Sequence, residues 1–149
     1  VSQINRLEEL LQDPRKTCLA LVTLPEELPV NETVEFYNAA QFTLHISADV
    51  VFVNAVWSAS YAADDMEAVD HIIKSLKSRP TFPVLQAWTD AAARHIHKRA
   101  QQEKYIRQIA AEIPRPCVEI PFCYANELAL TDIDQIAAQF LSALSAGEA

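Results

Sequence analysis

Glycine is almost absent from this chain, whose 149 residues contain one, Gly147. Loops that hold nucleotide phosphates depend on several glycines, because a side chain blocks positive φ angles and keeps the backbone away from the anion. The sequence therefore contains neither a glycine-rich phosphate loop nor a dinucleotide-binding fingerprint. If the chain takes part in nucleotide chemistry, it does not hold the phosphates by this device.

An excess of positive charge and long apolar runs are also missing. The formal net charge is −8, and nucleic-acid binding depends on Lys and Arg neutralising backbone phosphates, so no nucleic-acid partner is expected. No apolar run approaches the roughly 20 residues that a membrane-spanning helix needs. Because 50% of the 149 residues are hydrophobic, the chain can bury a real core. These features predict a cytoplasmic protein with a single domain over residues 1–149.

Cysteine and histidine are too scattered to suggest a metal site. The three cysteines, Cys18, Cys117 and Cys123, include no Cys-x-x-Cys pair, and the first two lie in apolar runs that suit reduced thiols in a core. His95 and His97 are two residues apart, so on a helix they point about 200° apart and cannot share one metal ion. We expect reduced cysteines and no metal ligand.

Two short runs rich in Val and Leu stand out in the first part of the chain, at residues 17–24 and 50–56. Neither run alternates between apolar and polar residues, which is typical of strands buried on both faces of a parallel sheet. A helical pattern over residues 31–42 supplies the crossover that a parallel pair of strands requires. The two runs therefore predict a βαβ unit.

Further helical patterns surround this unit. They predict a first helix over residues 1–12, a helix capped by Asp64 or Asp65, a long helix over residues 84–112 and a last helix capped by Thr131. A third short strand is expected at residues 117–120. The predicted fold is α/β, a partial parallel sheet of about three strands flanked by helices, with a helical insertion before the last strand.

Asn54 and Pro121 lie at the ends of the second and third predicted strands. Ligands of open parallel α/β sheets bind beyond the carboxyl ends of the strands, so both residues belong to the ligand-binding edge. An Asn amide pairs a donor with an acceptor and matches the edge of adenine, and the rigid backbone of Pro121 and Phe122 can flank a flat base. The alternative is structural: Asn54 satisfies backbone groups of its loop, and Pro121 only terminates a strand.

Five short motifs follow one another along the chain. They are Val22-Thr-Leu-Pro-Glu, Asn31-Glu32-Thr33, Val50-Val-Phe-Val-Asn54, Gln101-Gln-Glu-Lys-Tyr105, and Ile120-Pro121 with Glu127 shortly after. In this order, across residues 7–144, they resemble the C-terminal half of ArsA-type ATPases. That family includes arsenite-transport ATPases and ATPases that target tail-anchored membrane proteins.

The resemblance implies a deviant-Walker P-loop ATPase that couples ATP hydrolysis to anion transport or protein targeting. In that family the N-terminal half carries the phosphate loop, and the C-terminal half completes the P-loop-NTPase-like sheet and the adenine pocket. By this resemblance Asn54, Pro121 and Phe122 contact the base, and the complete protein binds ATP with Mg²⁺. This chain alone holds no catalytic residue and is expected neither to hydrolyse ATP nor to hold it tightly. The implied partners are its own N-terminal P-loop half or a homologous subunit, and a membrane-protein client or transporter.

Departures from the family pattern leave a second interpretation open. Glu35 stands where the family commonly has Arg, Pro121 and Glu127 are one residue further apart than the pattern, and no Cys-x-x-Cys supports a zinc-bridged dimer. The alternative function is a non-catalytic α/β interaction domain, a degenerate ATPase relative that docks a protein partner through its long helix. Under both interpretations, strands missing from the sheet would leave an exposed edge, which favours self-association.

Overall fold

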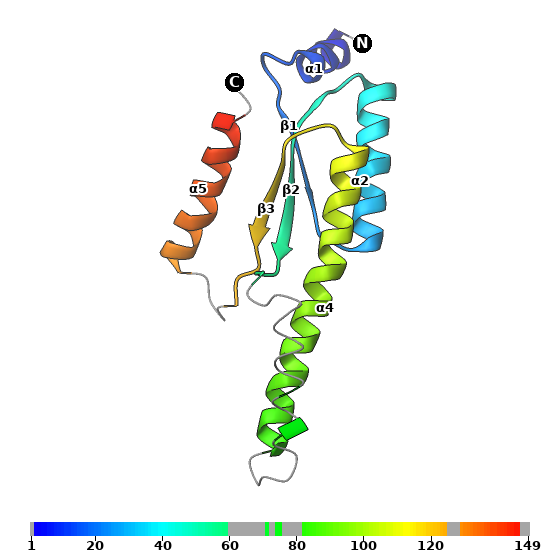
Figure 1. The fold of residues 1–149 in the computed structure, drawn as a ribbon. Coiled ribbons are helices and arrows are strands. Elements are labelled where there is room, and N and C mark those ends of the chain that lie inside the picture. Colours follow the sequence, from blue (N-terminus) through cyan, green and yellow to red (C-terminus); the bar gives the residue numbers. More distant parts are fainter. Residues whose placement is uncertain (1, 60–70, 72–73, 76–81, 125–128, 147–149) are drawn as a thin grey trace.

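A computed structural model describes residues 2–59, 71, 74–75, 82–124 and 129–146 (Figure 1). Its elements are α1 (Ser2–Gln12), β1 (Leu19–Thr23), α2 (Glu27–Ala39), the π-helical turn η1 (Ala40–Leu44), β2 (Ala48–Val56), α4 (Phe82–Glu112), β3 (Cys117–Pro121) and α5 (Leu130–Ala146). The three strands form one sheet in the order β1-β2-β3, and both pairings are parallel. The predicted α/β fold is confirmed. The helix predicted at Asp64 or Asp65 lies outside the described residues.

The βαβ unit follows the prediction, with a different start for its helix. In the sheet, β1 pairs with β2 so that Leu21 lies opposite Val51. The crossover helix begins at Glu27 instead of residue 31, and its cap Glu26 has extended backbone angles. Pro29 falls in the first turn of α2, where backbone N–H groups have no partner within the helix, so a proline costs little there.

The end of this helix is a π-helical turn that the sequence pattern does not indicate. The turn η1 ends at His45, which has the left-handed φ angle of 57° and whose N–H bonds the carbonyl of Ala40. A second bond to the same carbonyl comes from the N–H of Ile46, at 2.9 Å. A left-handed backbone costs a residue other than glycine about 1–2 kcal/mol. In a chain this poor in glycine, His45 takes a position that glycine occupies in many helix ends.

The sheet separates two apolar cores. In Figure 1, α2 and α4 lie on one side of the sheet and α5 on the other. The larger core, under α2 and α4, includes Leu21, Val30, Val34, Tyr37, Ala48, Val51, Val53, Val56, Ile109 and Ile113. The smaller core joins Val50, Phe52 and Ile120 to Val118, Ile136 and Phe140. The rings of Phe52 and Phe140 stack with their centroids 4.0 Å apart, which holds α5 against the sheet.

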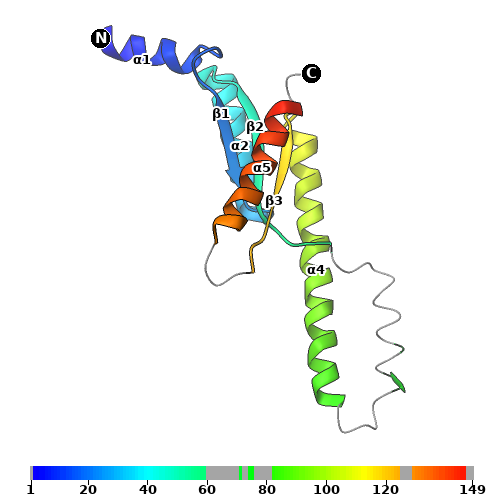
Figure 2. The same cartoon turned by 90° about the vertical axis from the view of Figure 1, so that its left-hand side faces the viewer.

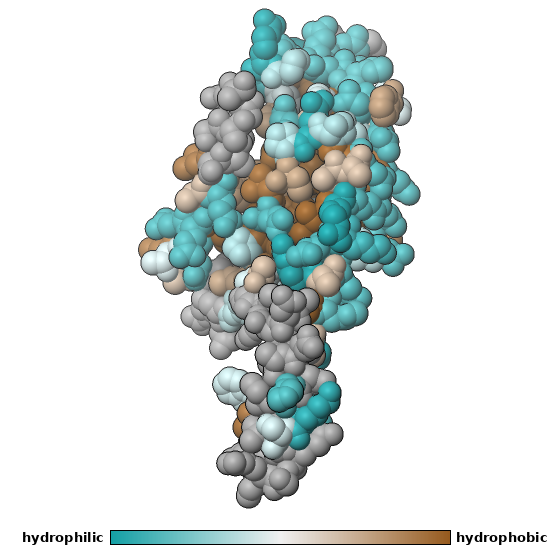
Figure 3. All heavy atoms as spheres, viewed as in Figure 1, coloured by the Kyte–Doolittle hydropathy of each residue, from teal (hydrophilic) through white to brown (hydrophobic). Residues whose placement is uncertain are grey.

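Apolar surface remains uncovered on the sheet. On the side of α5, no helix of the described residues packs over β1, and its Val22 is 65% exposed. The space-filling view shows further apolar atoms gathered over the sheet between α5 and α4 (Figure 3). Since β1 and β3 are the outer strands, both edges of the described sheet are open to another strand.

The long helix α4 extends well past the carboxyl ends of the strands (Figures 1 and 2). Its C-terminal half packs on α2 and β2, where Ile109 and Ile113, which directly follows the helix, are buried. The long-helix prediction is confirmed, and the observed start at Phe82 is two residues earlier than the predicted one. Among the described residues, no helix has both the length and the hydrophobicity for crossing a bilayer.

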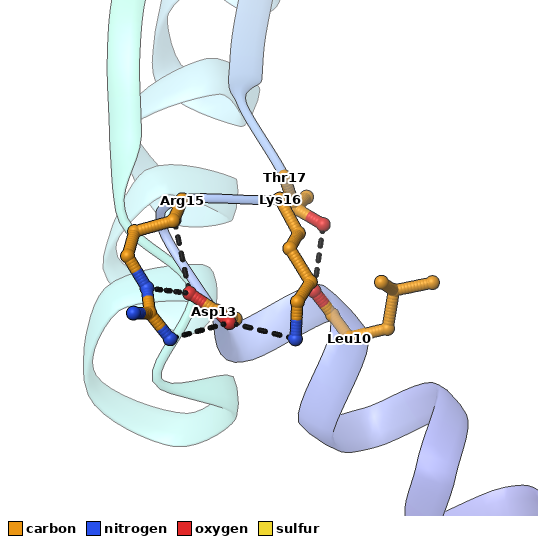
Figure 4. Close-up of polar contacts among 5 residues, drawn as sticks. All are labelled: Leu10, Asp13, Arg15, Lys16 and Thr17. Atoms are coloured by element: carbon orange, nitrogen blue, oxygen red, sulfur yellow. Dashed lines mark hydrogen bonds and ion pairs between the residues drawn. The ribbon is translucent and has the colours of Figure 1, made fainter.

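The helix α1 lies at the amino ends of the strands and projects away from the sheet (Figure 2). The predicted first helix is confirmed. It ends at Gln12, and the carboxylate of the following Asp13 accepts hydrogen bonds from Arg15 and contacts the ammonium of Lys16 at 2.9 Å (Figure 4). The hydroxyl of Thr17 donates to the carbonyl of Leu10 at 2.7 Å, so the turn also satisfies one of the free carbonyls at the helix end.

The last helix begins differently from the prediction. Its cap is Ala129 instead of Thr131: the carbonyl of Ala129 accepts the first bonds of the helix, and its N–H donates to the carboxylate of Asp132 at 2.9 Å. This is one half of a capping box, in which the third residue of the helix reaches back to the cap. The predicted capping role of Thr131 is therefore wrong.

Candidate functional site

The candidate residues meet at the carboxyl edge of the sheet. Asn54 lies two residues before the end of strand β2, and Pro121 is the last residue of β3. Pro121 lies opposite Val56 in the parallel register, and the N–H of Phe122 donates to the carbonyl of Val56 at 2.8 Å. The topology thus brings Asn54, Pro121 and Phe122 to one edge, where α/β folds bind ligands.

Asn54 faces a hollow that runs along the outer edge of β1. The hollow has a volume of about 600 Å³ and is lined by β1, by Pro29, Glu32, Thr33 and Phe36 of α2, and by Asn54. The side chain of Asn54 is exposed, and its Oδ1 atom accepts the N–H of Ala55 at 2.8 Å. The amide is therefore held at its own backbone while it remains accessible from solvent.

Pro121 and Phe122 line two smaller hollows on the other side of this edge. One, of about 190 Å³, lies between β3, α4 and α5 and includes Pro121, Arg99 and Gln139. The second, of about 280 Å³, includes Pro121 and Phe122 and reaches Asp132 at the start of α5. The hollow that includes Asn54 is lined by neither Pro121 nor Phe122, and the two hollows that include Pro121 are not lined by Asn54. The contact of all three residues with one base stays a prediction.

An aromatic cluster lies beside these hollows, and the sequence patterns did not indicate it. The ring of Trp57 lies 5.0 Å from His95, 6.0 Å from Phe122 and 6.1 Å from Tyr124, measured between centroids. His95 Nε2 and the hydroxyl of Tyr124 share a hydrogen bond of 3.1 Å. Trp57 and Tyr124 follow β2 and β3 closely enough to be suspected from the sequence. His95 comes from α4, and nothing in its neighbourhood in the sequence connects it to the strand ends.

The charged side chains of α4 near this edge are engaged in ion pairs. Arg99 contacts the carboxylates of Glu119 at 3.0 Å and Glu103 at 3.3 Å. Lys98 contacts Glu26, which follows β1, at 2.8 Å. The pKa of the Cys117 thiol is raised above its usual range, mainly by burial and to a lesser extent by the negative charge of Glu119. The basic run of α4 is thus partly neutralised by acidic residues of the strand ends.

The strand end itself is shaped by Gln102. This α4 residue is 2% exposed, its Oε1 atom accepts the N–H of Trp57 at 2.8 Å, and its Nε2 atom donates to the carbonyl of Ala55 at 3.0 Å. Ala55 has a left-handed φ angle of 60°. Gln102 lies in one of the five sequence motifs, but nothing in that motif indicates a contact with the end of a strand.

The residues at this edge fit the base of a nucleotide better than its phosphates. The exposed amide of Asn54 and the rings of Phe122 and Tyr124 are groups that bind a flat heterocycle by hydrogen bonding and stacking. The sequence has no glycine-rich loop for a triphosphate. In the part of the chain that the structure describes, no three His, Cys, Asp or Glu residues are grouped to hold a metal ion.

Comparison with known proteins relates the chain to one family. No curated protein matches it. Residues 1–78, just over half of the 149, match the family of anion-transporting ATPases, ArsA ATPase. The matched part contains β1, α2 and β2 with Asn54, and three of the five motifs identified in the sequence. This match indicates a function related to that of ATPases. The chain belongs to the anion-transporting ATPase family.

Proposed function

We propose that this chain is the base-binding and regulatory part of an ATP-driven machine that serves anion transport or protein targeting. The phosphate loop and Mg²⁺ site are supplied by another part of the protein or by a homologous subunit. The observation that carries the proposal is the meeting of Asn54, Pro121 and Phe122 at the carboxyl edge of the sheet, in a chain of an ATPase family. A cytoplasmic location fits its three free cysteines.

In this proposal the chain selects and positions the adenine. The amide of Asn54 offers hydrogen bonds to the edge of the base, and Phe122 covers a face of the ring and excludes water. Pro121 fixes the backbone direction from which Phe122 departs. ATP with Mg²⁺, when bound by the complete assembly, would supply the terminal phosphoryl group, which passes to water as ADP leaves. The chain itself contributes no catalytic residue.

The open edge of β1 is the proposed place for the missing part of the sheet. Its strand has a free outer side in the described structure, and Val22 and Leu24 are 65% and 40% exposed. A partner strand that pairs with β1, followed by a helix over these side chains, would bury this surface. It would also place a phosphate loop at the same carboxyl edge as Asn54. Without that partner the same edge favours self-association.

The test measures binding of an ATP analogue labelled on its ribose to the complex of this chain with the P-loop part of the ATPase. Asn54→Ala is expected to weaken binding about 5- to 10-fold, the loss of roughly 1 kcal/mol for one net hydrogen bond or slightly more. Asn38→Ala, on the exposed surface of α2, is the matched control. If the wild-type chain, Asn54→Ala and Asn38→Ala bind the ATP analogue with equal affinity, Asn54 does not contact the base.

The projecting half of α4 supports the second candidate function, a protein-docking domain. Trp88 is 76% exposed there, and it lines a shallow hollow with Ala87, Ala91 and Ala92. Tryptophan is enriched among the residues that contribute most of the binding energy at protein interfaces. This candidate predicts that Trp88→Ala abolishes binding of a protein partner. It also predicts that the chain does not bind ATP, either alone or in complex with the P-loop part. A shift of the Asn54 side-chain amide signals on addition of nucleotide would support the ATPase function instead.

A further inference from the structure

The end of strand β2 is distorted where it reaches the ligand-binding edge. The pairing of β2 with β3 shifts register between Val53 and Val56: Val53 lies opposite Glu119 and Val56 opposite Pro121, so β2 contains one extra residue here. Ala55, within this insertion, has a left-handed φ angle of 60°. An alanine adopts this angle at a steric cost that glycine does not have. Such a conformation persists only when surrounding groups hold it in place.

Gln102 supplies the groups that hold it. Of the described residues, two polar side chains are buried, Thr23 and Gln102. The amide of Gln102 bonds Ala55 with its donor and Trp57 with its acceptor, at 3.0 Å and 2.8 Å. An insertion in a strand leaves backbone groups without their ladder partners, and a buried backbone group needs one. The side-chain amide of α4 replaces the partner that β3 does not provide.

Asn54 immediately precedes the residue that is held in this way. Its Oδ1 atom accepts the N–H of Ala55, so the direction of the Asn54 amide depends on the orientation of the Ala55 peptide. We propose that Gln102 is a positioning residue, which fixes the left-handed turn at Ala55 and thereby sets the orientation of Asn54 toward the base. The effect of Gln102 on base binding rests on the proposed function of Asn54. The effect of Gln102 on the backbone of Ala55 rests on the geometry alone.

This arrangement also connects the base site to the long helix. Gln102 lies on α4, and the N-terminal half of the same helix extends past the sheet (Figure 2). A displacement of α4 relative to β2 would break both bonds of Gln102 together, because they reach the strand from one side chain. The affinity for the base would then depend on the position of α4.

The first measurement reports the backbone of Ala55 directly. In ¹³C,¹⁵N-labelled chain, the Cα and Cβ shifts and the three-bond HN–Hα coupling of Ala55 give its φ angle. Gln102→Met fills a similar volume without hydrogen bonds and is expected to move Ala55 out of the left-handed region and to shift the Asn54 side-chain amide signals. Gln101→Met, on the neighbouring exposed position of α4, is the matched control and should change neither.

Rescue by glycine separates positioning from general loss of structure. Adding Ala55→Gly to Gln102→Met should restore most of the Asn54 amide signal, because glycine adopts the left-handed angle without a bonded partner. Gln102→Glu is the second variant: it keeps the acceptor for Trp57 and loses the donor to Ala55, so it should show the same Ala55 shift in a folded chain. Unchanged Ala55 shifts in Gln102→Met and Gln102→Glu would overturn the proposal.

The second measurement is ATP-analogue binding by the complex with the P-loop part. Gln102→Met should weaken binding about tenfold, which corresponds to roughly 1.4 kcal/mol, and Ala55→Gly should recover most of it. Wild-type affinity in Gln102→Met, with Asn54→Ala weakened, would overturn the positioning role. If neither variant changes the affinity, the base assignment of Asn54 fails, and the Ala55 shifts then decide the structural role of Gln102 by themselves.

Discussion

Truncation of Ile109 tests whether α4 is held to the sheet by the core beneath it. Ile109 is 0% exposed and lies in the larger core with residues of β1, α2 and β2. Ile109→Ala removes three buried carbon atoms, a loss of about 2.4 kcal/mol at roughly 0.8 kcal/mol for each. The cavity that remains adds to this loss. We expect the free energy of unfolding to fall by about 3 kcal/mol, a large share of the 5–15 kcal/mol typical of a domain.

Urea denaturation followed by tryptophan fluorescence measures this change. Trp57 lies at the end of β2 against His95 of α4, so its emission reports the contact between helix and sheet. Val84→Ala, at a position 65% exposed on the same helix, is the control and should change stability by less than about 0.5 kcal/mol. A loss below about 1 kcal/mol in Ile109→Ala would refute the view that this core holds α4.

Three further predictions concern single groups. The pKa of Asp13 is lowered from 3.8 to about 2, mainly by the side-chain hydrogen bond from Arg15. The carboxylate should therefore stabilise the fold fully above pH about 4 and lose this contribution as the pH falls through about 2. A carboxyl ¹³C titration of Asp13 centred near 3.8 would contradict this. Partial desolvation and then Asp49 raise the pKa of Cys18, so Asp49→Asn should speed its alkylation by iodoacetamide, followed by mass spectrometry, and an unchanged rate would exclude the role of Asp49. His45→Gly should raise the free energy of unfolding by about 0.5–1 kcal/mol, because the left-handed angle at this residue no longer costs steric energy; lower stability in urea denaturation would count against strain there.

The parts of the fold that the sequence predicted are those set by local apolar patterns. The runs at residues 17–24 and 50–56 became β1 and β2, because strands buried on both faces lose their alternation. The parallel pairing followed from the helix between them. The last helix was recognised from its apolar spacing, and its interior fits that pattern, with Phe140 and Ile136 against the sheet.

The errors lie at element boundaries, where tertiary contacts and proline chemistry compete with simple patterns. The helical pattern predicts a start at residue 31, yet Pro29 already lies in the first turn of α2, a position where proline is tolerated. The sequence predicts Thr131 as the cap of the last helix, since a hydroxyl can accept an N–H of the first turn. Ala129 caps α5 instead, because Asp132 supplies the side-chain acceptor from within the helix.

In the candidate site too, one part could be predicted from the sequence and another could not. Its edge was predictable, because parallel strands place their carboxyl ends together, and Asn54 and Pro121 therefore came to one edge. Its shape was not predictable. An alanine such as Ala55 gives no sign of a left-handed angle, and the bonds of Gln102 join residues 45 and 47 positions apart.

Within the described ranges, two residues other than glycine have left-handed φ angles, His45 and Ala55. They lie at opposite edges of the sheet, and this difference supports a functional reason for one of them. His45 precedes β2 at the amino edge, and its N–H bonds the carbonyl of Ala40 in the helix end that it closes. Ala55 lies at the carboxyl edge beside Asn54, and a buried side chain of another helix holds it. Strain that is held by distant groups is typical of functional sites. Glycine should therefore stabilise the chain at both positions, but only at Ala55 should it free the base-binding amide from the control of α4.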